Sequence, residues 1–154
     1  MDFGSLLDLD IKWSLILINL VSLGVAYILA LPVAYDRELA ARGAGLRTFP
    51  LVAVAACGYT LVGMSVLDST EAESRVLQGL ITGIGFIGGG AILKSNGTVH
   101  GTATAASIWN TGLIGIAVAF GRFEVAILMS AINFLTLRFV RQFKVAEDEK
   151  EKED

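Results

Sequence analysis

The 154-residue sequence has little cysteine, histidine and charge, and each shortage excludes a class of protein. A single cysteine, Cys57, excludes a disulfide within one chain and a cluster of thiolate metal ligands. The one histidine, His100, has no partner at metal-ligand spacing, and we expect it at a helix end. Outside residues 147–154 acids and bases nearly balance, which excludes the basic surface of a nucleic-acid-binding protein. We therefore predict no metal site, no cofactor and no nucleic-acid partner.

Charge is absent from five long apolar runs, which together take up about two thirds of the chain. The last run is interrupted only by Glu124 and Arg138 near its ends. The runs are 13–35, 48–67, 76–93, 101–121 and 123–140. Each has about the 17–25 residues that a membrane-spanning helix needs. The sequence therefore predicts an all-α, polytopic membrane helix bundle of about five transmembrane helices over residues 1–144, followed by an acidic, disordered cytoplasmic tail over 145–154.

The basic residues indicate the orientation of these spans. With five spans, nine of the twelve lysines and arginines fall on the side that holds the 36–47 loop and the C-terminus. Only Lys12, Arg75 and Arg122 fall on the other side. Because cytoplasmic loops carry the excess of basic residues, we expect the N-terminus outside and the C-terminus in the cytoplasm.

Six glycines lie between Arg75 and Lys94, a density that would destabilise a helix in water by about 1 kcal/mol per glycine relative to alanine. The stretch 83–88 matches the dinucleotide pattern G-x-G-x-x-G, but no strand pattern precedes it and no acid follows at the required distance. In a bilayer, small residues let helices approach closely. We predict a glycine-rich central helix whose glycines pack against neighbouring helices or dock a partner helix. Docking of a second copy would give a homodimer. The alternative role for this segment is a constriction lined by backbone carbonyls. The glycines are Gly79, Gly83, Gly85, Gly88 and Gly89.

Polar side chains interrupt the last two apolar runs at Thr104, Asn110 and Asn133. Such groups usually form hydrogen bonds between the helices of a bundle, at about 0.6 kcal/mol each, and a polar lining for a narrow cavity is the functional alternative. The central part of each span contains no Asp, Glu, Lys, Arg or His, whereas ion pathways generally place one of these there. An independent coupled cation transporter is therefore disfavoured.

The charged loop 36–47 is the strongest candidate for a functional site. Glu38 and Arg42 have the i, i+4 order that favours a helical ion pair. One interpretation is a juxtamembrane cluster that only sets topology, and the other is an ion-paired cytoplasmic site. The second interpretation groups residues expected at the same membrane face: Arg37, Glu38, Arg47, Lys94 and Arg138.

Three motifs in order resemble the signatures of the MgtC/SapB family of bacterial inner-membrane proteins. The first joins Arg37-Glu-Leu39 to Ala44-Gly-Leu-Arg-Thr48, the second is 83–93, and the third is 99–109. Ala41 and Gly43 stand where the family usually has glycine and proline, which keeps the charges and loosens the turn. The chain also ends in an acidic tail where several members carry a cytoplasmic ligand-binding-like domain.

The resemblance implies a non-enzymatic, inner-membrane protein linked to low-magnesium adaptation and, in pathogens, to virulence. It implies action on other membrane proteins, among them the F-type ATP synthase or a cation transporter. The alternative is a magnesium or other cation transporter or channel, or an accessory subunit of one. The lack of intramembrane charge favours the modulator.

Overall fold

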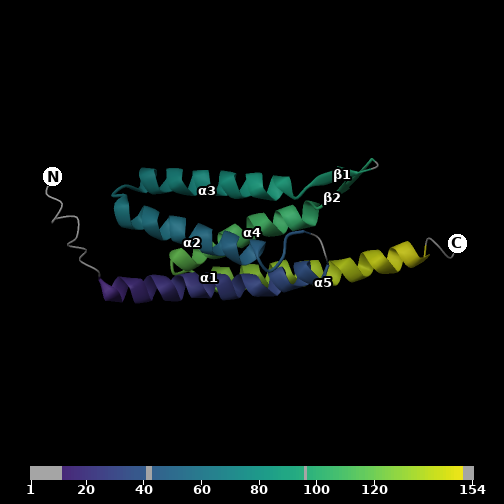
Figure 1. Cartoon of the computed structure of the whole chain (residues 1–154), viewed down its shortest axis with the longest axis horizontal. Coiled ribbons are helices and arrows are strands. Elements are labelled where there is room, and N and C mark those ends of the chain that lie inside the picture. The colour runs from purple at the N-terminus through teal and green to yellow at the C-terminus, as the bar shows by residue number, and fades with distance from the viewer. Residues whose placement is uncertain (1–11, 41–42, 96, 151–154) are drawn as a thin grey trace.

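The computed structural model describes residues 12–40, 43–95 and 97–150. Five helices run alternately up and down and are joined by short connections (Figure 1). They are α1 (Trp13–Leu39), α2 (Thr48–Val66), α3 (Thr70–Gly90), α4 (Thr102–Ala119) and α5 (Phe123–Lys150). Large apolar side chains cover much of the outside, which suits contact with lipid. The predicted all-α membrane helix bundle is confirmed.

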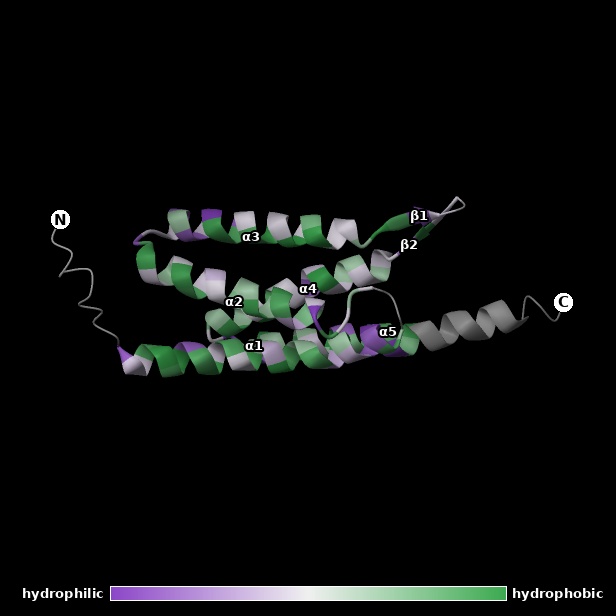
Figure 2. Ribbon diagram, in the orientation of Figure 1, coloured by the Kyte–Doolittle hydropathy of each residue, from purple (hydrophilic) through white to green (hydrophobic). Residues whose placement is uncertain are grey.

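Four of the five helices, α1, α2, α4 and α5, are long and apolar enough to cross a membrane. Helix α3 is not among them, because Glu71, Glu73 and Arg75 occupy its first two turns. The uncharged remainder of α3 is about 22 Å long at 1.5 Å per residue, against a hydrocarbon core of about 30 Å. Figure 2 shows the difference, since hydrophobic colour dominates α1 and is broken by pale and purple turns in α3. The predicted third span is thus a helix that is partly polar.

A short β-hairpin, which the sequence reading did not predict, separates α3 from α4. Strands β1 (Leu93–Ser95) and β2 (Thr98–His100) are antiparallel, and Ser95 faces Thr98. The turn contains Gly97, whose φ of +81° suits glycine, while Asn96 lies outside the described residues. Asn96 and Gly97 form the Asn-Gly pair that is the strongest short sequence signal for a hairpin turn. His100 therefore lies in a strand instead of at a helix end.

Helix α4, and not the glycine-rich α3, is the centre of the bundle. It contacts all four other helices, and most of its residues are buried. Helix α3 lies at the edge against α4 and α2, and only Ile84 and Gly88 of its residues are buried. The central position predicted for α3 is thus corrected. Glycine allows close approach but offers no side chain to bury, so a glycine-rich helix need not be enclosed.

Among the described residues, the buried apolar side chains form two core clusters. The first includes Val33, Phe49 and Ile108, and the second includes Cys57 and Ile114. Helix α4 contributes to both clusters, which explains its burial. Helix α5 continues to Lys150, beyond the domain boundary predicted at 144, and residues 151–154 lie outside the described residues. The division into a membrane domain and a disordered tail stays a prediction.

Candidate functional site

At the end of α1, two neighbouring charged residues form a buried ion pair. The guanidinium of Arg37 donates from Nη2 and Nε to Oδ2 of Asp36, over 2.6 and 3.2 Å. Asp36 is 3% exposed and Arg37 is 4% exposed. Consecutive residues on a helix normally point in different directions, so the long arginine side chain folds back to reach the carboxylate. Arg37 was predicted in an ion-paired cytoplasmic site, and the structure buries it against Asp36.

Asp36 was not among the predicted site residues. The signal was present, because an acid directly before Arg37 at the end of an apolar run offers a partner for a charge that must be buried. Sequence reasoning passed over it because pairs at i, i+4 are the usual helical partners.

Glu38 clamps the connection between α1 and α2. Its Oε2 accepts a hydrogen bond from the peptide N–H of Leu46 over 3.0 Å. The same carboxylate oxygen occupies the space that a Cβ on Gly45 would need, which explains a glycine at this position. The predicted partner, Arg42, lies outside the described residues. Glu38 therefore holds the loop through backbone contacts.

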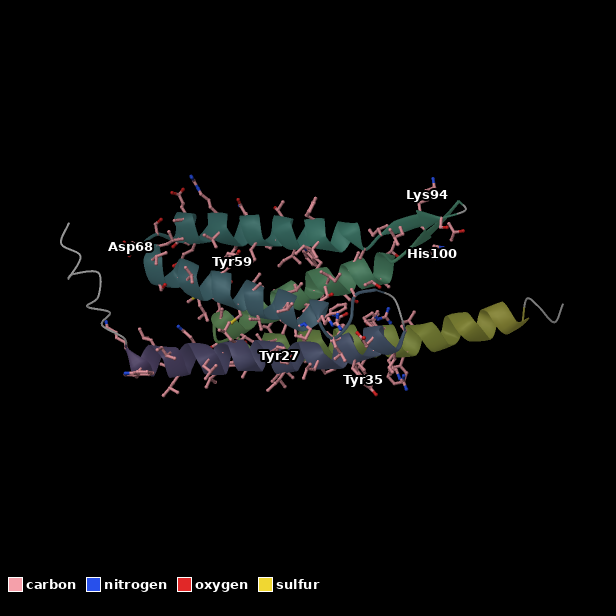
Figure 3. All side chains as sticks on the ribbon, viewed as in Figure 1. Tyr27, Tyr35, Tyr59, Asp68, Lys94 and His100 are labelled. Atoms are coloured by element: carbon pink, nitrogen blue, oxygen red, sulfur yellow. The ribbon has the colours of Figure 1, made fainter. Side chains whose placement is uncertain are left out.

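Arg47, Lys94 and Arg138 are exposed. They lie at the start of α2, in β1 and in the second half of α5, and these segments share the end of the bundle where α1 finishes (Figure 1). Lys94 projects away from the helices at the hairpin (Figure 3). Among residues 12–40, 43–95 and 97–140, no ion pair or side-chain hydrogen bond joins these cations to one another or to Glu38. They share an end of the molecule without forming one network.

The predicted packing glycines of α3 divide into one that packs and four that do not. A Cβ on Gly88 would lie 3.0 Å from the carbonyl oxygen of Ala105 in α4. At Gly79, Gly83, Gly85 and Gly89 a Cβ would have no other atom within 4 Å. Within the monomer these four glycines leave open surface.

The closest helix contacts are instead made by two glycines of α4. A Cβ on Gly112 would overlap the side chain of Ile84, and a Cβ on Gly115 would overlap the carbonyl oxygen of Ala53. Neither glycine was among the predicted packing residues. Their position in the helix with the most buried residues explains why they, and not the α3 glycines, permit the close crossings.

A groove of about 520 Å³ lies between α2 and α3. On the α3 side its wall includes Gly79, Gly83 and Phe86, and on the α2 side it includes Val52 and Tyr59. Tyr59 is labelled in Figure 3, and Phe86 is 84% exposed. The lining is almost entirely apolar. The open glycines of α3 thus border a groove of the size that a bound apolar group can fill.

Two of the three predicted polar residues lie at the junction of α4 and α5. Asn133 donates from Nδ2 to the carbonyl oxygen of Ser107 over 3.3 Å, and Asn110 donates to that of Met129 over 3.4 Å. Thr104 is buried in the same helix as Asn110. Oδ1 of Asn110 is buried without a hydrogen-bond partner among the described residues. The two amides therefore link α4 to α5, as polar groups in bundles usually do.

The described part of the chain also bears on metal binding. No cluster of three or more histidine, cysteine or carboxylate side chains that could hold an ion occurs in that part of the chain. Cys57 is a free, buried thiol.

Comparison with known proteins gives the family. A sequence model of the MgtC family matches residues 23–146. Over 117 residues the chain is 33% identical to the Escherichia coli protein named putative magnesium transporter YhiD, covering 71% of this chain and 54% of YhiD. It is 33% identical to MgtC of Salmonella typhimurium, covering 73% of this chain and 48% of MgtC.

A third relative is SapB of Bacillus subtilis, which is 30% identical and covers 79% of this chain and 56% of SapB. The chain spans about half the length of the curated relatives it matches. No solved structure matches it. Because the family match covers most of the sequence and includes all three motifs, the chain belongs to the MgtC family, and its four long apolar helices make it a multi-pass bacterial membrane protein.

Proposed function

We propose that this chain acts without catalysis as a modulator of other bacterial inner-membrane proteins during adaptation to low magnesium. The observation that carries the proposal is the apolar groove between α2 and α3. The magnesium link comes from the name of YhiD, a putative magnesium transporter, and from the family resemblance. In this role the chain itself does not transport ions across the membrane.

The groove has the features of a surface that receives a transmembrane helix. Gly79 and Gly83 leave its α3 side without projecting side chains, so a partner backbone can approach closely. Tyr59 and Phe86 border it with aromatic surface that is exposed in the monomer. Contacts of this kind depend on shape and van der Waals packing, because apolar burial gives little driving force between helices in lipid. The partner is a membrane helix, with the F-type ATP synthase or a cation transporter as candidates that the family resemblance names.

The exposed charges support a second contact outside the bilayer. The exposed carboxylate of Glu38 and the exposed cations of Arg47, Lys94 and Arg138 lie at one end of the bundle. The excess of basic residues at this end favours a cytoplasmic position, with the N-terminus outside. We assign this end to contact with the cytoplasmic part of a partner, while the Asp36–Arg37 pair stabilises the fold.

A cation channel or transporter subunit is the second candidate, and one observation favours it. The unpartnered Oδ1 of Asn110 is a neutral oxygen of the type that coordinates hard cations. Against it, the amide nitrogens of Asn110 and Asn133 are used in hydrogen bonds to the backbone. A single oxygen is far fewer than the six ligands that magnesium takes.

The groove can be tested by filling it. Gly83→Leu places a large side chain in the groove, and because no atom lies within 4 Å of a Cβ there, the fold is retained. In a bacterial strain that depends on this chain for growth in low magnesium, we expect Gly83→Leu to reduce growth to that of the strain lacking the chain. Growth in ample magnesium should be unchanged.

The matched control is Gly24→Leu in α1, where the same change also meets open space but lies away from the groove. It should support growth like the unsubstituted chain. Full growth with Gly83→Leu at normal protein levels would contradict the role of the groove.

A further inference from the structure

One face of α3 carries polar and small residues at the spacing of a helix–helix seam. Successive members are separated alternately by four and three residues. They are Glu71, Arg75, Gln78, Thr82, Gly85 and Gly89, and all six are exposed. The alternation of four and three is the heptad spacing that keeps a row of residues on one side of two helices that supercoil around each other. We call these six residues the α3 seam.

The α3 seam faces away from its own bundle. Helix α3 packs on the core through Ile84, Leu77 and Leu80, which lie on the opposite side of the helix. A Cβ on Gly85 or Gly89 would meet no atom within 4 Å. The residues of the α2–α3 groove form a separate stripe that does not include any seam residue. The seam is therefore a second, independent open face of the same helix.

A polar face of this kind is unfavourable when it points into lipid. The hydroxyl of Thr82 is satisfied by donating to the carbonyl oxygen of Gln78 over 2.8 Å. The side-chain amide of Gln78 makes no hydrogen bond within the described part of the chain. Where this face of α3 meets lipid, little water is available to replace that bond, and polar side chains surrounded by lipid normally face other protein. We therefore expect another protein to cover the α3 seam along its length.

We propose that the partner is a second copy of this chain, paired seam to seam. Two copies inserted in the same orientation are related by a two-fold axis along the membrane normal, so their α3 helices run parallel. Each seam residue then lies beside its own counterpart. The surface must therefore be complementary to itself.

The α3 seam is complementary to itself at its start, in its middle and at its end. At its start, Glu71 of each copy lies one turn from Arg75 of the other, so two carboxylates are balanced by two guanidiniums. The amide of Gln78 both donates and accepts, so the two amides can bond to each other. At the other end, Gly85 and Gly89 let the backbones approach closely. A polar residue in such a seam also fixes the register of the pair.

Pairing through the seam leaves both grooves open. The dimer presents two copies of the α2–α3 groove on its outside, each available to a partner helix. The inference does not require the proposed function, since the seam and the groove share no residue. Their tests can fail separately.

Cysteine crosslinking in native membranes tests the proposal. The natural thiol is removed by Cys57→Ser, and single cysteines are introduced by Gly85→Cys in the seam or Gly79→Cys in the groove. A disulfide needs Cα atoms within about 7 Å, so only positions facing their counterpart should react. With a mild oxidant we expect the Gly85→Cys chain to form a covalent dimer at a yield about tenfold above that of the Gly79→Cys chain. The seam-to-seam dimer would be overturned by equal dimer yields for the two variants or by a higher yield for Gly79→Cys. Crosslinks formed only to other proteins would overturn it as well.

A second measurement covers the case in which Cys57→Ser disturbs the fold. Energy transfer between labelled copies in liposomes is compared for the unsubstituted chain, for Gly85→Leu with Gly89→Leu, and for Gly24→Leu as the control. Because the two seam glycines touch nothing in the monomer, the double variant should fold and yet associate about tenfold more weakly. Unchanged association of the double variant would contradict the seam, and so would an equal loss with Gly24→Leu.

Discussion

Gly115→Ala is expected to prevent the chain from forming a stable bundle. The added Cβ would overlap the carbonyl oxygen of Ala53 and lie 2.9 Å from the backbone nitrogen of Cys57. Both are backbone atoms of α2, so no side chain can rotate away, and α4 must separate from α2. Overpacking of a tight core usually costs about 1–3 kcal/mol and occasionally more, and rigid backbone on one side places this case at the upper end. Thermal unfolding of the purified chain in detergent should show a large fall in Tm or an aggregated product.

Gly79→Ala is the matched control for this prediction. It makes the same chemical change in α3, where a Cβ meets no atom within 4 Å. Alanine is favoured over glycine in a helix by about 1 kcal/mol, so the control should match or exceed the original Tm. If Gly115→Ala and Gly79→Ala had the same Tm, that result would contradict the close contact between α4 and α2 at Gly115.

The second large effect is expected from breaking the buried pair of Asp36 and Arg37. Arg37→Leu leaves the carboxylate of Asp36 buried without its partner. Removing one member of a buried pair typically costs about 3–5 kcal/mol, because the remaining charge is uncompensated. The measurement is the free energy of unfolding in mixed detergent.

Two further variants separate pairing from simple loss of charge. Arg47→Leu removes an exposed arginine one loop away and should change stability by less than about 0.5 kcal/mol. The double change Asp36→Leu with Arg37→Leu should recover much of the loss, since replacing both members by apolar residues is often neutral. If the double variant were as unstable as the sum of the single changes, the two charges would not act as a pair.

The helices were predictable because their apolar runs are long and their ends are marked by charge. Helices α2 and α4 begin and end close to the predicted runs 48–67 and 101–121. The arrangement of the helices was less predictable. Glycine density suggested that α3 is central, but burial depends on side chains from several helices, and α4 supplies those side chains to both core clusters.

The candidate site shows the same contrast. The sequence indicated that the end of α1 carries the functional charges, and the geometry separates them into a buried pair at Asp36 and Arg37 and a loop clamp at Glu38. The burial of Arg37 depends on how the other helices pack around the end of α1, which no local pattern encodes. For the α3 glycines, only three-dimensional packing distinguishes Gly88, which touches α4, from the four glycines that remain open.

Magnesium flux into liposomes that contain only this chain is the most direct test of the central claim that it acts on other proteins. The chain is reconstituted into vesicles loaded with a magnesium-sensitive dye, and protein-free vesicles give the baseline. We predict magnesium influx equal to that baseline, both for the unsubstituted chain and for Gly83→Leu. Robust influx through the unsubstituted chain that Gly83→Leu abolishes would contradict it, and would show that the glycine segment of α3 carries the ion itself.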